Sequence, residues 1–197
     1  MIEQKESEAL GSFLSLRGIV SDTGPLLSIF QSDQVTLLRF LYDRVYIPQS
    51  TLPEFEKHGA AAPITDLVSN GLIVICELND HERERAQKLS EEIAIHPLTN
   101  DKLPLSHYPE AEAMVLLARS ELQTREILLD EQAAREIAKT HGLTVIGFPG
   151  LLIRACMAEQ ITPEEVQDIL LKCVSLGTHY SRTLIDGVYD RLKKENR

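Results

Sequence analysis

Six carboxylates of this sequence stand where an expected strand ends or an expected helix begins. They are Asp22, Glu54, Glu110, Glu112, Asp130 and Glu131. In a parallel α/β sheet, the carboxyl ends of the strands and the starts of the following helices face one edge, so these side chains could converge there. Carboxylates brought together raise one another's pKa, and a cation that prefers oxygen ligands, such as Mg²⁺ or Mn²⁺, relieves the repulsion. Because such a cation can activate water against a phosphodiester, the pattern indicates metal-dependent phosphodiester hydrolysis.

Each acid also has a purely structural interpretation. Asp22 can cap the helix that follows it, as Asp often does, and Asp130 or Glu131 can cap the next helix along the chain. The three glutamates at helix starts are favoured there by the helix dipole alone. The sequence leaves both interpretations open. If Asp22 is a site residue, the neighbouring hydroxyl of Thr23 could orient a water or a phosphate oxygen.

The elements that would position these acids alternate along the chain. Runs rich in β-branched and apolar residues predict strands at 18–22, 44–48, 72–76, 127–131 and 143–147. Apolar residues at helical spacing predict helices at 26–30, 35–42, 60–70, 81–95, 109–118, 133–140 and 151–159. Ser50 or Thr51 is expected to cap the helix that carries Glu54, and Thr162 to begin a capping box. The alternation predicts an α/β fold with a mainly parallel sheet.

Composition limits the kind of partner. The net charge is −10, all of it within residues 1–150, which argues against a broad basic surface for nucleic acid. An enzyme whose acids bind metal is compatible with that charge. No apolar run approaches the ~20 residues that span a bilayer, so no membrane association is expected. The three cysteines are widely spaced and are expected to be buried thiols in a reducing compartment, the cytoplasm.

Four segments, taken in order, carry a resemblance to a known family. They are Val-Ser-Asp-Thr-Gly-Pro-Leu at 20–26, Tyr-Ile-Pro at 46–48 with Glu54 beyond it, Pro-Glu-Ala-Glu-Ala at 109–113, and Leu-Leu-Asp-Glu-Gln-Ala-Ala-Arg at 128–135. This series resembles the PIN-domain ribonucleases. It is most similar to the branch in which Gly-Glu-Ala-Glu-Ala precedes Asp-Asp-x-x-Ala-Arg and a Gly-Leu-x-Val-x-Gly strand.

The resemblance implies a three-layer α/β/α sandwich and cleavage of single-stranded RNA with Mg²⁺ or Mn²⁺. It implies catalytic acids at Asp22, Glu54, Glu112 and Asp130, of which Asp22, Glu112 and Asp130 would bind the metal. Glu110 and Glu131 would be auxiliary residues, and Thr23 is added to them because its hydroxyl is next to Asp22 in the sequence. Many members are toxins held in check by an antitoxin protein, and many form homodimers, so both partners are expected here.

Two positions depart from the pattern of that branch. Pro109 stands where the branch has glycine, and Glu131 where it has a second aspartate. Pro109 suits a helix start, so the fold is unaffected. Glu131 has a longer reach than aspartate and bears on activity. The alternative function is therefore a catalytically weak or inactive PIN-like module that binds a protein partner or RNA.

Two basic residues follow the acids of the fourth segment. Arg135 and Lys139 lie one helical turn apart and could face a phosphate of RNA, although a solvated helix face is the ordinary interpretation of such a pair. The predicted organisation is an N-terminal extension over 1–17, a nuclease domain over 18–158 and a C-terminal helical extension over 159–197.

Overall fold

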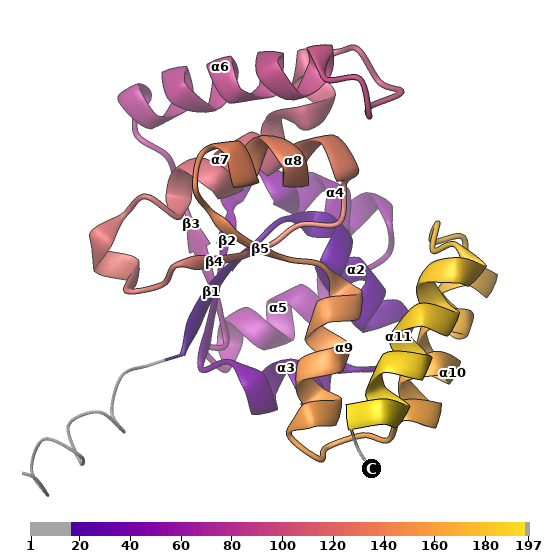
Figure 1. The fold of residues 1–197 in the computed structure, drawn as a ribbon. Helices are drawn as coiled ribbons and strands as arrows, with labels where there is room; N and C mark the ends of the chain where they lie inside the picture. Colours follow the sequence, from indigo (N-terminus) through magenta and orange to yellow (C-terminus); the bar gives the residue numbers. More distant parts are fainter. Residues whose placement is uncertain (1–16, 196–197) are drawn as a thin grey trace, which may run out of the picture.

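The computed structural model describes residues 17–195. It shows the five expected strands paired in parallel in one sheet (Figure 1). Their order in the sheet is β3-β2-β1-β4-β5, so β1 lies at the centre. β1 pairs with both β2 and β4. The strands are β1 (Gly18–Ser21), β2 (Arg44–Pro48), β3 (Ile73–Cys76), β4 (Glu126–Leu128) and β5 (Thr144–Ile146).

Helices cover both faces of this sheet (Figure 1). One face packs against α6 (Asp80–Ile95), α7 (Tyr108–Leu116) and α8 (Gln132–Thr140). The other packs against α2 (Thr23–Gln31), α3 (Val35–Leu41), α4 (Leu52–Lys57), α5 (Ala61–Ser69), α9 (Phe148–Met157), α10 (Pro163–Ser175) and α11 (Arg182–Glu195). Short 3-10 turns occupy Gln49–Thr51, Pro104–His107 and Ser120–Leu122. The predicted three-layer α/β/α sandwich is confirmed.

Two cores result from the alternation of side chains along the strands. Ile19 and Leu128 are fully buried in the core shared with α2 and α9. Val20 and Ile127, their neighbours in sequence, are fully buried in the core shared with α7 and α8. Because successive side chains of a strand point to opposite faces, a strand covered on both sides is apolar throughout. That is why these strands could be predicted from unbroken apolar runs.

The C-terminal helices share the core of the sheet. Leu170 of α10 and Leu192 of α11 lie in the same buried cluster as Ile19. The capping box predicted at Thr162 is present, with Glu165 as its reciprocal partner. The division of the chain at residue 158 stays a prediction, and residues 1–16 of the predicted N-terminal extension lie outside the described residues. No helix within residues 17–195 is long and apolar enough to cross a membrane.

Two helices begin three residues earlier than predicted. α2 begins at Thr23 and α9 at Phe148, and each carries a proline in its first turn, Pro25 and Pro149. Proline is tolerated there because its missing N–H would have no partner within the helix. The prediction that Ser50 or Thr51 caps α4 was wrong. The hydroxyl of Thr51 donates to the carbonyl of Pro48 at 2.7 Å, and that of Ser50 donates to Glu112.

Candidate active site

Asp22 lies at the carboxyl end of the central strand. Its backbone N–H donates to the carbonyl of Leu128 at 3.1 Å, and its carboxylate accepts from the N–H of Gly24 at 3.4 Å, which caps α2. The side chain is nearly buried, with 5% of the residue exposed. Burial, together with the charges of Glu54 and Asp130, raises the pKa of Asp22 from 3.8 to about 7. Asp22 is therefore both a helix cap and a member of an acidic group.

Asp130 stands beside Asp22 at the end of β4. One of its oxygens, Oδ1, accepts from the N–H of Phe148 at 2.9 Å, so it serves the start of α9 instead of capping α8. The other, Oδ2, accepts from the hydroxyl of Tyr180 at 3.2 Å. Burial raises the pKa of Asp130, although these two hydrogen bonds favour its charged form. Tyr180, in the segment between α10 and α11, is a site contact that the sequence did not suggest.

Two glycines border the aspartates. A Cβ at Gly24 would lie 3.8 Å from Asp22 Oδ2 and 3.9 Å from the Cβ of Asp130, so both acids border the same point. At Gly147 a Cβ would lie 2.8 Å from Asp130 Oδ1 and 2.6 Å from a guanidinium nitrogen of Arg135. Only glycine fits at residue 147 without displacing these groups.

Glu110 brings a third element, α7, to the acidic group. Burial and the charges of Asp22, Glu54 and Glu131 raise its pKa well above the usual range. Its Oε2 atom is buried and has no hydrogen-bond partner, and the same is true of the hydroxyl oxygen of Thr23. A buried polar atom without a partner is costly, which suggests that these two atoms serve a bound group.

Glu131 and Glu54 occupy the edge of this group. Glu131 Oε2 accepts from the N–H of Ala134 at 2.5 Å, so the capping interpretation of Glu131 is confirmed. Glu54 stands in the first turn of α4, half-buried, and its charge acts on both Asp22 and Glu110. The acidic group therefore consists of Asp22, Glu54, Glu110 and Asp130, with Glu131 at its border.

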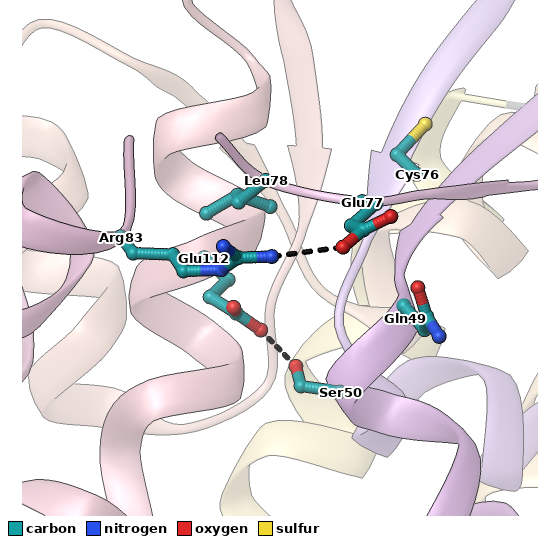
Figure 2. Close-up of a pocket in the computed structure, with 7 residues that line it drawn as sticks. All are labelled: Gln49, Ser50, Cys76, Glu77, Leu78, Arg83 and Glu112. Carbon is teal, nitrogen blue, oxygen red and sulfur yellow. Dashed lines mark hydrogen bonds and ion pairs between the residues drawn. The ribbon is translucent and has the colours of Figure 1, made fainter. Parts of the chain in front are cut away.

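Glu112 lies elsewhere, contrary to the prediction that it joins Asp22 and Asp130. It accepts a hydrogen bond from the hydroxyl of Ser50, in a separate cavity shown in Figure 2. Residues two apart on a helix point in nearly opposite directions, about 200° around the axis, so Glu110 and Glu112 cannot both face Asp22. Burial raises the pKa of Glu112 to about 7, partly offset by the charge of Arg83.

The two basic residues of α8 differ in their surroundings. Arg135 is half-buried, donates to the carbonyl of Leu129 at 2.7 Å and stabilises the charge of Asp130. Lys139 is exposed and pairs with Glu136 at 2.6 Å on the outer face of the helix. The solvated interpretation fits Lys139, whereas Arg135 borders the acidic group.

A known protein family matches most of this chain. The model of the DUF3368 family, described as a PIN domain, matches residues 18–194. The chain belongs to the PIN-domain family. No curated protein matches the chain. PIN domains are generally nucleases, so the fold of this PIN domain is of a nuclease type.

The donors of this PIN domain suit a hard divalent cation in kind, because all of them are oxygens. Glu110 Oε2 and Thr23 Oγ1 have no hydrogen-bond partner, and a cation would relieve both the burial and the neighbouring charges that raise the pKa of Asp22. Across residues 17–195, however, no three His, Cys, Asp or Glu side chains lie close enough to hold one ion. The donor set thus fits a cation chemically, while its carboxylates stand apart from one another.

Proposed function

We propose that this PIN domain is a metal-dependent endoribonuclease that hydrolyses phosphodiester bonds of single-stranded RNA with Mg²⁺ or Mn²⁺. One observation carries the proposal. Carboxylates on three other elements, Glu54, Glu110 and Asp130, interact electrostatically with Asp22 beside the central strand, and burial together with the charges of Glu54 and Asp130 raises the pKa of Asp22 to about 7. Buried acids that repel one another cost folding free energy, so their grouping beside the central strand favours a catalytic role.

Each residue has a part in the proposed reaction. Asp22, Glu110 and Asp130 are the residues we assign to hold the cation, with Glu110 in the position first expected for Glu112. Their side chains would have to move closer together to share one ion. A bound cation would supply Lewis-acid polarisation of the phosphate. The free hydroxyl of Thr23 would orient a phosphate oxygen or the attacking water. Glu54 is half-buried at the edge of the group, so it is the residue we assign to accept a proton from that water.

Other contacts would keep Asp130 in place. Tyr180 and the N–H of Phe148 each donate to one of its oxygens, and each carboxylate oxygen can accept a second partner. Arg135 adds a positive charge beside it, which favours the ionised form that binds metal. We assign these groups positioning roles.

A role as the toxin of a toxin–antitoxin pair also belongs to this proposal. Its support is an exposed apolar stretch from the end of α6 to the following 3-10 turn, where Ile95 is 79% and Leu105 is 83% exposed. Leu98 and Leu103 in the same stretch are also exposed. Such side chains suit a protein partner, either an antitoxin or a second copy in a homodimer. All three cysteines are buried and none forms a disulfide, which is compatible with action in the cytoplasm.

The direct test is cleavage of end-labelled single-stranded RNA by the wild type and by Asp22→Asn, with Mn²⁺ or Mg²⁺ and with chelator. The wild type should cut only with metal, and the variant should lose at least about 100-fold in rate. Asp66→Asn, which changes an exposed acid on α5, is the matched control and should cut like the wild type. Equal cutting by the wild type and the Asp22 variant would show that these acids are not the site.

A second candidate function is a binding module with little or no catalytic activity. Two observations favour it: the carboxylates are not gathered around one point, and Glu131 is used as a helix cap. A working site should gain thermal stability when Mn²⁺ is added, because a ligand that binds only the folded state stabilises it by mass action. An unchanged melting temperature at millimolar Mn²⁺ would favour the binding module.

A further inference from the structure

A second polar cavity opens at the same edge of the sheet as the acidic group. Its volume is about 240 Å³. It lies where β2 and β3 end: Gln49 and Ser50 follow β2, and Cys76 and Leu78 mark the end of β3. Figure 2 shows Glu112 pointing into it from α7. The proposed nuclease reaction uses none of these residues.

Helix α7 separates this cavity from the acidic group. Glu110 reaches the acidic group and Glu112 reaches the cavity from opposite sides of one helical turn. An α-helix with its side chains is about 10–12 Å across. A stacked nucleic-acid strand advances about 3.4 Å per nucleotide, so the cavity lies within a few nucleotides of a phosphate at the acidic group.

The lining of the cavity provides the contacts that a nucleobase requires. Leu78 and Cys76 are the apolar residues of the lining and can contact the face of a base, and Gln49 offers an amide (Figure 2). The guanidinium of Arg83 reaches across the cavity and is tied to Glu77 and Asp80, each at 2.9 Å. A tethered guanidinium can stack on a base or contact its phosphate.

Glu112 is the polar group best placed to recognise the edge of a base. Only 6% of the residue is exposed, and its one hydrogen bond within the described residues is the one from Ser50 to Oε2. Each carboxylate oxygen accepts up to two hydrogen bonds, so Oε1 and part of Oε2 remain available. A carboxylate held in this way accepts from two adjacent N–H donors. Among the four RNA bases, the Watson–Crick edge of guanine presents such a pair, at N1 and N2.

We propose that this cavity binds one base of the RNA substrate, with guanine preferred because Glu112 accepts from its N1–H and N2–H groups. The inference rests on the proposed function, since it names the sequence preference of the same substrate. It assigns Glu112 to substrate specificity and leaves metal binding to Glu110. The other interpretation of the cavity is a water-filled depression with a carboxylate satisfied by Ser50 alone.

The test exchanges the hydrogen-bond pattern at residue 112. Glutamine has the shape of glutamate but presents one acceptor and one donor, which matches the N6–H and N1 of adenine. Binding of short labelled RNAs that differ at a single base is measured by anisotropy in the Asp22→Asn background, where cleavage does not interfere. With Glu112 present, the RNA carrying guanine should bind about ten-fold more tightly than the RNA carrying adenine, as expected for a bidentate contact. Glu112→Gln should remove or reverse this difference in affinity.

Controls separate this proposal from the proposed function. Glu56→Gln, on the exposed side of α4, should leave the base preference unchanged, and the melting temperature of Glu112→Gln shows whether the variant folds. A preference that survives the Glu112 change, or RNA binding with no base preference, would overturn the assignment even if the wild type is a nuclease. A preference that depends on Glu112 in a protein that cleaves no RNA would leave the cavity established and the nuclease proposal refuted.

Discussion

The buried carboxylate of Asp22 should make the folded state less stable as pH rises. Its pKa is about 7 in the folded protein against 3.8 for an ordinary aspartate. Between these two values the folded state holds a proton that the unfolded state has released, so the free energy of unfolding falls as pH increases. The loss begins near pH 4 and is complete just above pH 7. At about 1.36 kcal/mol per pKa unit, the shift sets a ceiling of roughly 4 kcal/mol.

Asp22→Asn should recover this free energy. Asparagine carries no charge, and its side-chain oxygen can still accept from the N–H of Gly24, so the cap of α2 is kept. Because Asp22 shares its repulsion with neighbouring acids, we expect a gain of about 2 kcal/mol at pH 8. Most of the gain should disappear as pH falls towards 4, because Asp22 is then protonated in the folded state and only about half ionised in the unfolded state. Urea denaturation followed by circular dichroism at pH 8 and pH 4.5 measures both values.

Asp66→Asn distinguishes this effect from the general benefit of removing negative charge from a protein of net charge −10. Asp66 is exposed on α5, and its replacement should change the free energy of unfolding by less than about 0.5 kcal/mol at either pH. If Asp22→Asn is no more stable than the wild type at pH 8, or if both variants gain equally, the electrostatic argument for the acidic group is wrong.

Two further changes test how the group is held. Gly147→Ala should destabilise the fold by about 1–3 kcal/mol and reduce cleavage, because the added Cβ would lie 2.6 Å from Arg135 and 2.8 Å from Asp130. Gly187→Ala on α11, where a Cβ meets nothing within 4 Å, should instead stabilise by up to about 1 kcal/mol in the same urea assay. Tyr180→Phe keeps the ring but removes the hydroxyl that donates to Asp130, so the free energy of unfolding should fall by about 1 kcal/mol. Mn²⁺ titration should also show weaker binding by Tyr180→Phe; affinity equal to that of the wild type would remove Tyr180 from the positioning contacts.

The layout of the sheet could be predicted because its signals are local. The runs that became β1 and β4 are apolar on both faces, since Val20 and Ile127 enter one core while Ile19 and Leu128 enter the other. The carboxylates that follow these strands could be placed at one edge from the geometry of parallel sheets alone.

The details of the acidic group could not be predicted because they depend on rotation and on distant contacts. Glu110 and Glu112 both lie in the first turns of α7, and only the rotation of that helix decides which of them meets Asp22. Ser50 was expected to cap a helix, but its hydroxyl lies against Glu112, 62 residues away. The partner of Asp130, Tyr180, is 50 residues away, and no local pattern marks it.

The most direct test of the central claim compares Mn²⁺ binding by the wild type, Glu110→Gln and Glu112→Gln in isothermal titration calorimetry. Asp22, Glu110 and Asp130 are the proposed ligands, so the wild type and Glu112→Gln should bind Mn²⁺ with similar affinity. Glu110→Gln should lose at least about ten-fold, as expected when a charged ligand is removed. Loss of binding in Glu112→Gln with retention in Glu110→Gln, or no binding by the wild type, would contradict the assignment of the site.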